Sequence, residues 1–95
     1  MAEDLRAAVI AALRGVVDPE TGGDLVAMGL IYEVAVEDGT ARVTLTTTTR
    51  GCPLSEMLRR GAEDAALAVP GITEAQVTLT WTPPWTPDRM EARAF

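Results

Sequence analysis

The spacing of apolar positions along this chain predicts two amphipathic helices. Apolar residues recur at intervals of three and four over residues 5–16, the spacing that places them on one helix face: Leu5, Ala8, Val9, Ala12, Leu13 and Val16. The same spacing predicts a second helix over residues 53–69, with a buried stripe of Leu54, Met57, Leu58, Ala62, Ala65, Ala66 and Val69. Gly61 lies on that stripe, and we expect it to allow close approach to a sheet. Pro70-Gly71 should end this helix.

Alternating apolar positions predict three strands. Residues 30–37 and 40–48 flank Asp38-Gly39, a strong signal for a two-residue hairpin turn. The first strand should direct Leu30, Tyr32, Val34 and Val36 to one face, and the second should direct Ala41, Val43, Leu45 and Thr47 to one face. Residues 75–82 form the third predicted strand, with Val77, Leu79 and Trp81 alternating.

The remaining segments are predicted to be loops and terminal segments. Residues 17–29 are rich in turn formers, and we expect a connecting loop there. Trp81 is expected in the core, and Trp85 is expected to pack across the sheet edge rather than to serve as a partner surface. Residues 88–95 are expected to form a short turn of helix. The order predicts an α+β fold: one α-β-β-α-β domain over residues 1–95, with a sheet of three or more strands and helices on one face.

Composition and charge exclude several function classes. The 95 residues carry a net charge of −6, which disfavours nucleic-acid partners. We expect no membrane association, because the chain has no apolar run long enough to span a bilayer and begins without a basic signal region. The single cysteine favours a reducing, cytoplasmic location. The absence of histidine excludes Ser-His and Cys-His pairs within the chain, and also His-based zinc sites.

The chemistry of the chain centres on Cys52, in the segment Arg50-Gly51-Cys52-Pro53. If Pro53 is the first helical residue, Cys52 is the N-cap. Its sulfur would then lie near unpaired backbone N–H groups, which favour the thiolate, and Arg50 would add positive charge. The alternative is that Cys52 is a small, half-buried apolar residue. These residues alone leave both interpretations open.

Two further groups of polar residues surround this segment in the sequence. Asp18, Glu20 and Asp24 supply three carboxylates in one loop, suited to a hard cation or to a metal beside Cys52. A solvated turn, with Asp18 capping the turn at Pro19, is the favoured interpretation of that loop. The hydroxyls of Thr48 and Thr49 could donate to a thiolate or a sulfide, or these residues could simply favour strand. Thr46 and Thr47 are interpreted as strand formers.

Taken in order, several motifs resemble one known family. They are Asp18-Pro19-Glu20, residues 24–32, Thr48-Thr49-Arg50-Gly51-Cys52-Pro53, Pro70-Gly71-Ile72 and Pro83-Pro84-Trp85. This combination resembles the metal–sulfur (iron–sulfur) cluster assembly factors, whose members include SufT-type proteins, PaaD-type proteins and the eukaryotic cytosolic cluster-targeting factor. Members commonly have proline where this chain has Arg50. PaaD-type members add a cysteine-rich C-terminal region that this sequence lacks, so a SufT-like stand-alone domain is favoured.

The resemblance implies a fold like the C-terminal domain of NifU-type scaffolds and a non-enzymatic role in maturing iron–sulfur proteins. It implies Cys52 as a transient ligand of iron or of an iron–sulfur cluster, or as a thiol that contacts clients, supported by Asp18, Glu20, Asp24, Thr48 and Thr49. Arg50, where the chain departs from the family, would make the surroundings of the cysteine more cationic. The implied partners are the assembly machinery and client apoproteins. Because one thiolate cannot hold a cluster, a homodimer is one way to complete the ligand set.

Two alternatives to an assembly factor stay open. One is a thiol-dependent enzyme with Cys52 as nucleophile and Asp18 or Asp24 as base, which the absence of histidine weakens. The other is an adaptor without chemistry that works through Trp85.

Overall fold

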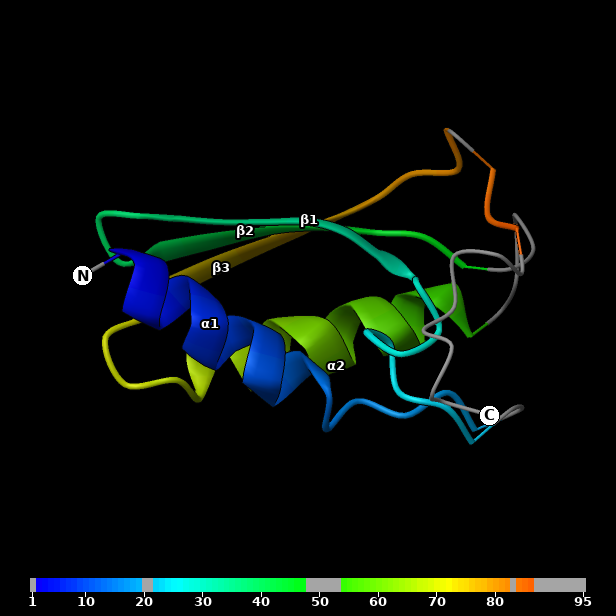
Figure 1. The fold of residues 1–95 in the computed structure, drawn as a ribbon, viewed down its shortest axis with the longest axis horizontal. Helices are drawn as coiled ribbons and strands as arrows, with labels where there is room; N and C mark the ends of the chain where they lie inside the picture. The colour runs from blue at the N-terminus through cyan, green and yellow to red at the C-terminus, as the bar shows by residue number, and fades with distance from the viewer. Residues whose placement is uncertain (1, 20–21, 48–53, 83, 87–95) are drawn as a thin grey trace.

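Figure 1 shows the computed structural model of the chain, which describes residues 2–19, 22–47, 54–82 and 84–86. Five elements follow one another: α1 (Ala2–Leu13), β1 (Ile31–Glu37), β2 (Thr40–Leu45), α2 (Ser55–Leu67) and β3 (Glu74–Leu79). This order confirms the predicted α-β-β-α-β sequence of elements. The predicted helical turn over residues 88–95 lies outside the described residues. No helix in the described part of the chain is long and apolar enough to cross a membrane.

The three strands form one mixed sheet in the order β1-β2-β3. β1 and β2 pair antiparallel, and β2 and β3 pair parallel. Both turn residues of the β1–β2 hairpin have positive φ, 51° at Asp38 and 79° at Gly39, as the favoured two-residue hairpin turn requires. Because parallel neighbours cannot be joined by a tight turn, the chain crosses from β2 to β3 through α2.

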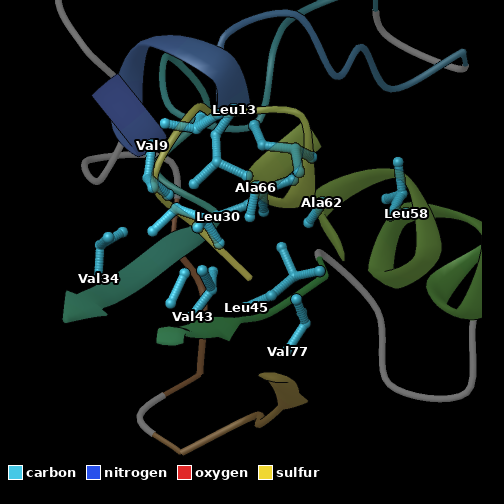
Figure 2. Packing of buried hydrophobic residues seen from close by; sticks show 14 of the residues in the cluster. Val9, Leu13, Leu30, Val34, Val43, Leu45, Leu58, Ala62, Ala66 and Val77 are labelled. Atoms are coloured by element: carbon cyan, nitrogen blue, oxygen red, sulfur yellow. The ribbon is translucent and has the colours of Figure 1, made fainter. Parts of the chain in front are cut away.

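Both helices cover the same face of the sheet, and the core lies between the two layers (Figure 1). Figure 2 shows side chains of α1, α2 and all three strands converging there, among them Val9, Ala62 and Val43. Leu13, Leu30 and Leu45 are fully buried. The open face of β2 and β3 is polar, because alternate strand residues point away from the helices. The predicted inward residues of β2, including Thr47 beyond its end, are all buried.

Several boundaries and core assignments differ from the sequence predictions. α1 begins at Ala2 and ends at Leu13, three residues earlier at each end than the predicted 5–16. β2 ends at Leu45 rather than at residue 48. Met57, assigned to the buried stripe of α2, is 48% exposed, because the stripe that packs on the sheet follows Leu58, Ala62 and Ala66. The register of β1 also shifts between Ile31 and Glu33, so strict alternation fails there.

Gly61 allows a close approach, but to a different element from the one predicted. A Cβ at this position would lie 3.1 Å from Cγ1 of Val16, which follows α1. The missing side chain therefore lets α2 approach the segment after α1, not the sheet.

The outer edge of β1 is held by α1. Nε of Arg6 donates a hydrogen bond of 2.8 Å to the carbonyl oxygen of Val34, a residue of this edge strand. This hydrogen bond joins the helix layer to the backbone of β1. It adds to the apolar packing between the two layers.

The depth of this core leads to a stability prediction. Leu13→Ala should lower the free energy of unfolding by about 2–5 kcal/mol, because a fully buried leucine leaves a cavity when truncated. Leu67→Ala is the matched control, since Leu67 is 42% exposed and should lose less than about 1 kcal/mol. Urea unfolding of both variants measures the difference. Equal losses would contradict the described packing.

Candidate functional site

Four segments meet at one end of the sheet, where β2 ends and α2 begins (right in Figure 1). The N–H of Thr46 donates to the carbonyl oxygen of Leu30 at 2.8 Å, which ties the end of β2 to the loop before β1. The N–H of Thr80 donates to the carbonyl oxygen of Leu45 at 2.9 Å, which ties the segment after β3 to the same place. The Cys52 segment connects β2 to α2 in the sequence.

A buried polar cluster, which we call the hydroxyl clamp, consists of Thr47, Ser55 and Trp81. Oγ of Ser55 donates to Oγ1 of Thr47 at 3.3 Å, and Nε1 of Trp81 donates to the same oxygen at 2.9 Å. Thr47 is 4% exposed and Ser55 is 7% exposed. Because buried hydroxyl groups need partners, these contacts fix three segments relative to one another.

The sequence predictions do not include this clamp, because they interpret Thr47 as a strand former and do not single out Ser55. The signal is present in the alternation, which places the Thr47 hydroxyl on the inward, apolar face of its strand. A hydroxyl at such a position requires a buried polar partner. Trp81, expected in the core, is half-buried and supplies one of those partners.

Asp24 has a structural role in the loop before β1. Its Oδ1 accepts a hydrogen bond of 2.8 Å from the N–H of Ala27, and its carbonyl oxygen accepts from the N–H of Met28 at 3.0 Å. Asp24 is therefore the N-cap of a single helical turn. That turn ends at Gly29, whose φ is 71°.

Asp18 follows Val17, whose backbone forms an isolated antiparallel bridge with Asp24. The Asp18 N–H donates to the carbonyl oxygen of Gly23 at 2.9 Å, and its carbonyl oxygen accepts from the N–H of Gly22 at 2.7 Å. Asp18 is only 8% exposed. The favoured interpretation of this loop as a turn is thus confirmed for its backbone, although Asp18 is more buried than a solvated turn implies.

Of the candidate residues, the structure describes Asp18 and Asp24, and the others lie outside the described residues: Glu20, Thr48, Thr49, Arg50 and Cys52. Within the described ranges, no group of three acidic or cysteine side chains is placed to hold a metal ion. The prediction that Pro53 begins the second helix and Cys52 caps it was wrong. α2 begins at Ser55 with Leu54 as N-cap, and the first helical bond runs from the N–H of Leu58 to the carbonyl oxygen of Leu54.

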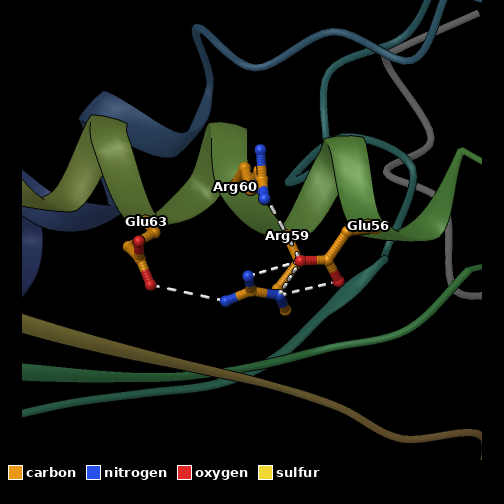
Figure 3. Close-up of polar contacts among 4 residues, drawn as sticks. All are labelled: Glu56, Arg59, Arg60 and Glu63. Atoms are coloured by element: carbon orange, nitrogen blue, oxygen red, sulfur yellow. Dashed lines mark hydrogen bonds and ion pairs between the residues drawn. The ribbon is translucent and has the colours of Figure 1, made fainter.

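The carboxylate nearest the start of α2 is engaged within the helix. Nε of Arg59 donates to both carboxylate oxygens of Glu56 at 3.0 Å, and Nε of Arg60 lies 3.7 Å from Oε1 (Figure 3). Nη1 of Arg59 also lies 3.4 Å from a carboxylate oxygen of Glu63. The hydrogen bond from Arg59 lowers the pKa of Glu56 from its ordinary value of 4.5, helped by the charges of Arg59 and Arg60. Glu56 is therefore an ionised partner of these arginines.

Trp85 packs against the core, as predicted. Its side chain is half-buried, and its Nε1 donates to the carbonyl oxygen of Met28 at 2.7 Å. This contact joins the proline-rich segment to the helical turn that Asp24 caps. An indole engaged in this way is poorly suited to serve as the main docking surface for a partner.

A cavity of about 160 Å³ opens between α1 and β1. Its lining includes Arg6, Ile10, Val26 and Tyr32. None of the described candidate residues lines it, so the end of β2 and this cavity are separate features.

The motifs quoted from the sequence agree with the comparison against known families. Residues 6–79 match the family described as "Iron-sulfur cluster assembly protein". The chain belongs to this family. The matched range contains both the Cys52 segment and the hydroxyl clamp apart from Trp81.

Individual family members are similar over nearly their whole length. The Fe-S protein maturation auxiliary factor YitW of Bacillus subtilis is 40% identical over 95 residues, which cover 99% of this chain and 93% of YitW. The Fe-S protein maturation auxiliary factor SufT of Staphylococcus aureus is 39% identical over 80 residues, which cover 83% of this chain and 91% of SufT. The resemblance to SufT-type factors is therefore confirmed.

A solved structure of the family confirms the fold. The crystal structure of a domain of unknown function, DUF59, from Bacillus anthracis superposes with a TM-score of 0.91 at 35% sequence identity. The superposition covers 98% of this chain and 90% of that chain. The α+β architecture of this iron–sulfur assembly protein is thus shared with a relative of known structure.

Two substitutions at Asp24 test the capping hydrogen bond separately from the negative charge. Asp24→Ala should lower the free energy of unfolding by about 0.5–2 kcal/mol, because the N–H of Ala27 loses its acceptor. Asp24→Asn should be close to wild type, since asparagine offers the same oxygen. Urea unfolding measures both variants. An alanine variant as stable as wild type would contradict the capping role.

The pairing of Glu56 predicts a pH dependence. A carboxylate whose pKa is lowered in the folded state contributes stability above its unfolded pKa and loses it as the pH falls through the folded pKa. Glu56→Gln should therefore be less stable than wild type at pH 7, and the difference should shrink below about pH 4.5. High salt should also reduce it, because the pair is exposed. Glu33→Gln is the exposed control. A difference that grows on acidification would be the opposite of this expectation.

Proposed function

We propose that this chain is a stand-alone maturation factor that helps to load iron–sulfur clusters into client apoproteins. The observation that carries the proposal is the similarity to YitW, which extends over 99% of this chain and names a maturation auxiliary factor. The family description, an iron–sulfur cluster assembly protein, supports the same role.

In this proposal the cluster is cargo, and Cys52 is its transient ligand. Iron–sulfur clusters are generally held by four protein ligands, most often thiolates. The chain has one cysteine and no histidine. A cluster bound through Cys52 must therefore share its remaining ligands with a client, an external thiol or a second copy of the chain. Shared ligation suits transfer, because the cargo leaves when the client completes its own ligand set.

The described residues support a non-enzymatic role. Asp24 is a candidate base for a Cys52 nucleophile, but its Oδ1 is engaged by the N–H of Ala27. Glu56 is paired with Arg59 and Arg60. The Asp24 carboxylate is thus already engaged as a cap, and the cations beside Glu56 favour its charged form and make it a weaker base. We therefore propose that Cys52 binds or contacts rather than attacks.

The proposed partners are the proteins that supply iron and sulfide, and the client apoproteins that receive the cluster. The proposed location is the cytoplasm, where a lone thiol stays reduced. The proposal also gives Glu20, Thr48, Thr49 and Arg50 a role as supports for Cys52.

The proposal can be tested by reconstitution. The purified chain is given iron and sulfide without oxygen and mixed with an apoenzyme whose activity needs a [4Fe–4S] cluster. Wild type should speed activation of the apoenzyme. Cys52→Ala should lose this effect by at least about tenfold, since even residues that only support a metal ligand cost roughly 10- to 100-fold when mutated.

Met57→Ala is the matched control, because Met57 is an exposed side chain close to the start of α2. It should activate the apoenzyme at the wild-type rate. The visible absorption of the chain before mixing shows whether it binds a cluster itself. Equal activation by wild type and Cys52→Ala would reject Cys52 as the functional thiol.

A further inference from the structure

The cavity between α1 and β1 combines an apolar wall with two opposite charges. It has a volume of about 160 Å³ and is lined by Arg6, Ile10, Val26, Ile31, Tyr32, Glu33 and Val34. Its aliphatic side chains come from three parts of the chain: α1, the loop before β1, and β1 itself. Small-molecule sites in proteins are commonly apolar hollows in which a few polar groups orient the ligand. The lining of this cavity has that composition.

The cavity lies where β1 departs from regular pairing. The register of β1 against β2 shifts between Ile31 and Glu33. A regular strand directs successive side chains to opposite faces. All four residues from 31 to 34 nevertheless line the cavity. Irregularities of this kind re-aim side chains and are frequent next to active sites.

Arg6 brings a positive charge to the cavity. Its Nε donates to the carbonyl oxygen of Val34 at 2.8 Å, and this bond fixes the guanidinium beside the cavity. The N–H groups of both Nη atoms are further donors, and a guanidinium pairs well with a carboxylate through two parallel hydrogen bonds. Arg6 is therefore suited to hold a carboxylate at the mouth of the cavity.

Glu33 brings a negative charge to the same cavity. Within the described residues, neither Glu33 nor Arg6 has an ion-pair partner. A simple anion would meet repulsion from Glu33 and from the net charge of −6, and a simple cation would meet repulsion from Arg6. A ligand that carries both charges satisfies both residues.

We propose that this cavity binds a free α-amino acid with a small aliphatic side chain. Arg6 holds the carboxylate and Glu33 holds the ammonium group. The aliphatic side chain packs against Ile10, Val26 and Ile31. The volume corresponds to about five water molecules at roughly 30 Å³ each, which suits a ligand of the size of valine or leucine. The site does not involve Cys52, so amino-acid binding and activation of the apoenzyme can fail independently.

The experiment titrates the ¹⁵N-labelled full chain with L-leucine and follows the backbone amide signals by NMR. The signals of the lining residues should shift and saturate, with a Kd on the order of 1 mM for so small a ligand. Two analogues then test the charges on the wild-type chain. Leucinamide lacks the carboxylate and 4-methylpentanoate lacks the ammonium group. Each should bind about tenfold more weakly, because one charged group of the cavity is left without a partner.

Two variants assign each charge to its residue. Arg6→Gln should remove the preference for leucine over leucinamide, and Glu33→Gln should remove the preference for leucine over 4-methylpentanoate. Arg42→Gln is the matched control, because Arg42 is an exposed arginine that pairs with Glu37 at 3.6 Å and does not line the cavity. This variant should bind leucine as the wild type does. If Arg6→Gln does not fold, the comparison of analogues on the wild-type chain still decides the proposal.

Three results would overturn the proposal. The first is the lack of saturating shifts at about ten times the expected Kd. The second is equal binding of leucine and 4-methylpentanoate, because the ligand would then be any small carboxylate. The third is tighter binding of N-acetyl-leucine, whose blocked nitrogen imitates the end of a peptide chain, because the occupant would then be a protein partner.

Discussion

The parallel pairing of β2 and β3 is the constraint on which the rest of this structure depends. Two parallel neighbours need a crossover, and in this chain the crossover is α2, whose buried stripe completes the core over the sheet. The connection from β2 to α2 must then leave at the carboxyl end of β2 and enter the helix at its N-terminal end. The segment that carries Cys52 is that connection. Backbone hydrogen bonds hold the loop before β1 and the segment after β3 at the end where β2 finishes.

At this end of the sheet, polar side chains replace aliphatic ones in the interior. Thr46, Thr47 and Ser55 are buried here, whereas Val43 and Leu45, within β2, are buried and apolar. Hydroxyl groups in such a place are stable only with defined partners, so they specify one arrangement of the chain more sharply than apolar contacts do.

Most of the fold could be predicted from the sequence, because the signals for each element are local. The presence of α1 and α2, the Asp38-Gly39 turn and the inward residues of β2 follow such signals and were confirmed, although Met57 of the predicted stripe is exposed. The start of α2 and the exposure of Met57 were not predictable in this way. Pro53 is compatible with a first helical position, but helix boundaries depend on which carbonyl accepts the first helical bond, and that depends on tertiary packing. The hydroxyl clamp was not predicted for a similar reason, since Ser55 and Trp81 meet Thr47 only after the sheet has formed. For the candidate site, sequence identified the acidic loop and Cys52 as features, and the structure gave Asp24 a role as a helix cap.

The hydrogen bond from Arg6 to Val34 affects whether another strand can add to the sheet at β1. β1 is an edge strand, and edge strands offer free backbone groups on which other chains can build. Arg6 occupies the carbonyl oxygen of Val34 on this edge with a charged side chain from α1. Another strand cannot extend the sheet past this point without displacing the guanidinium. The arginine therefore makes addition of a further strand at Val34 less favourable.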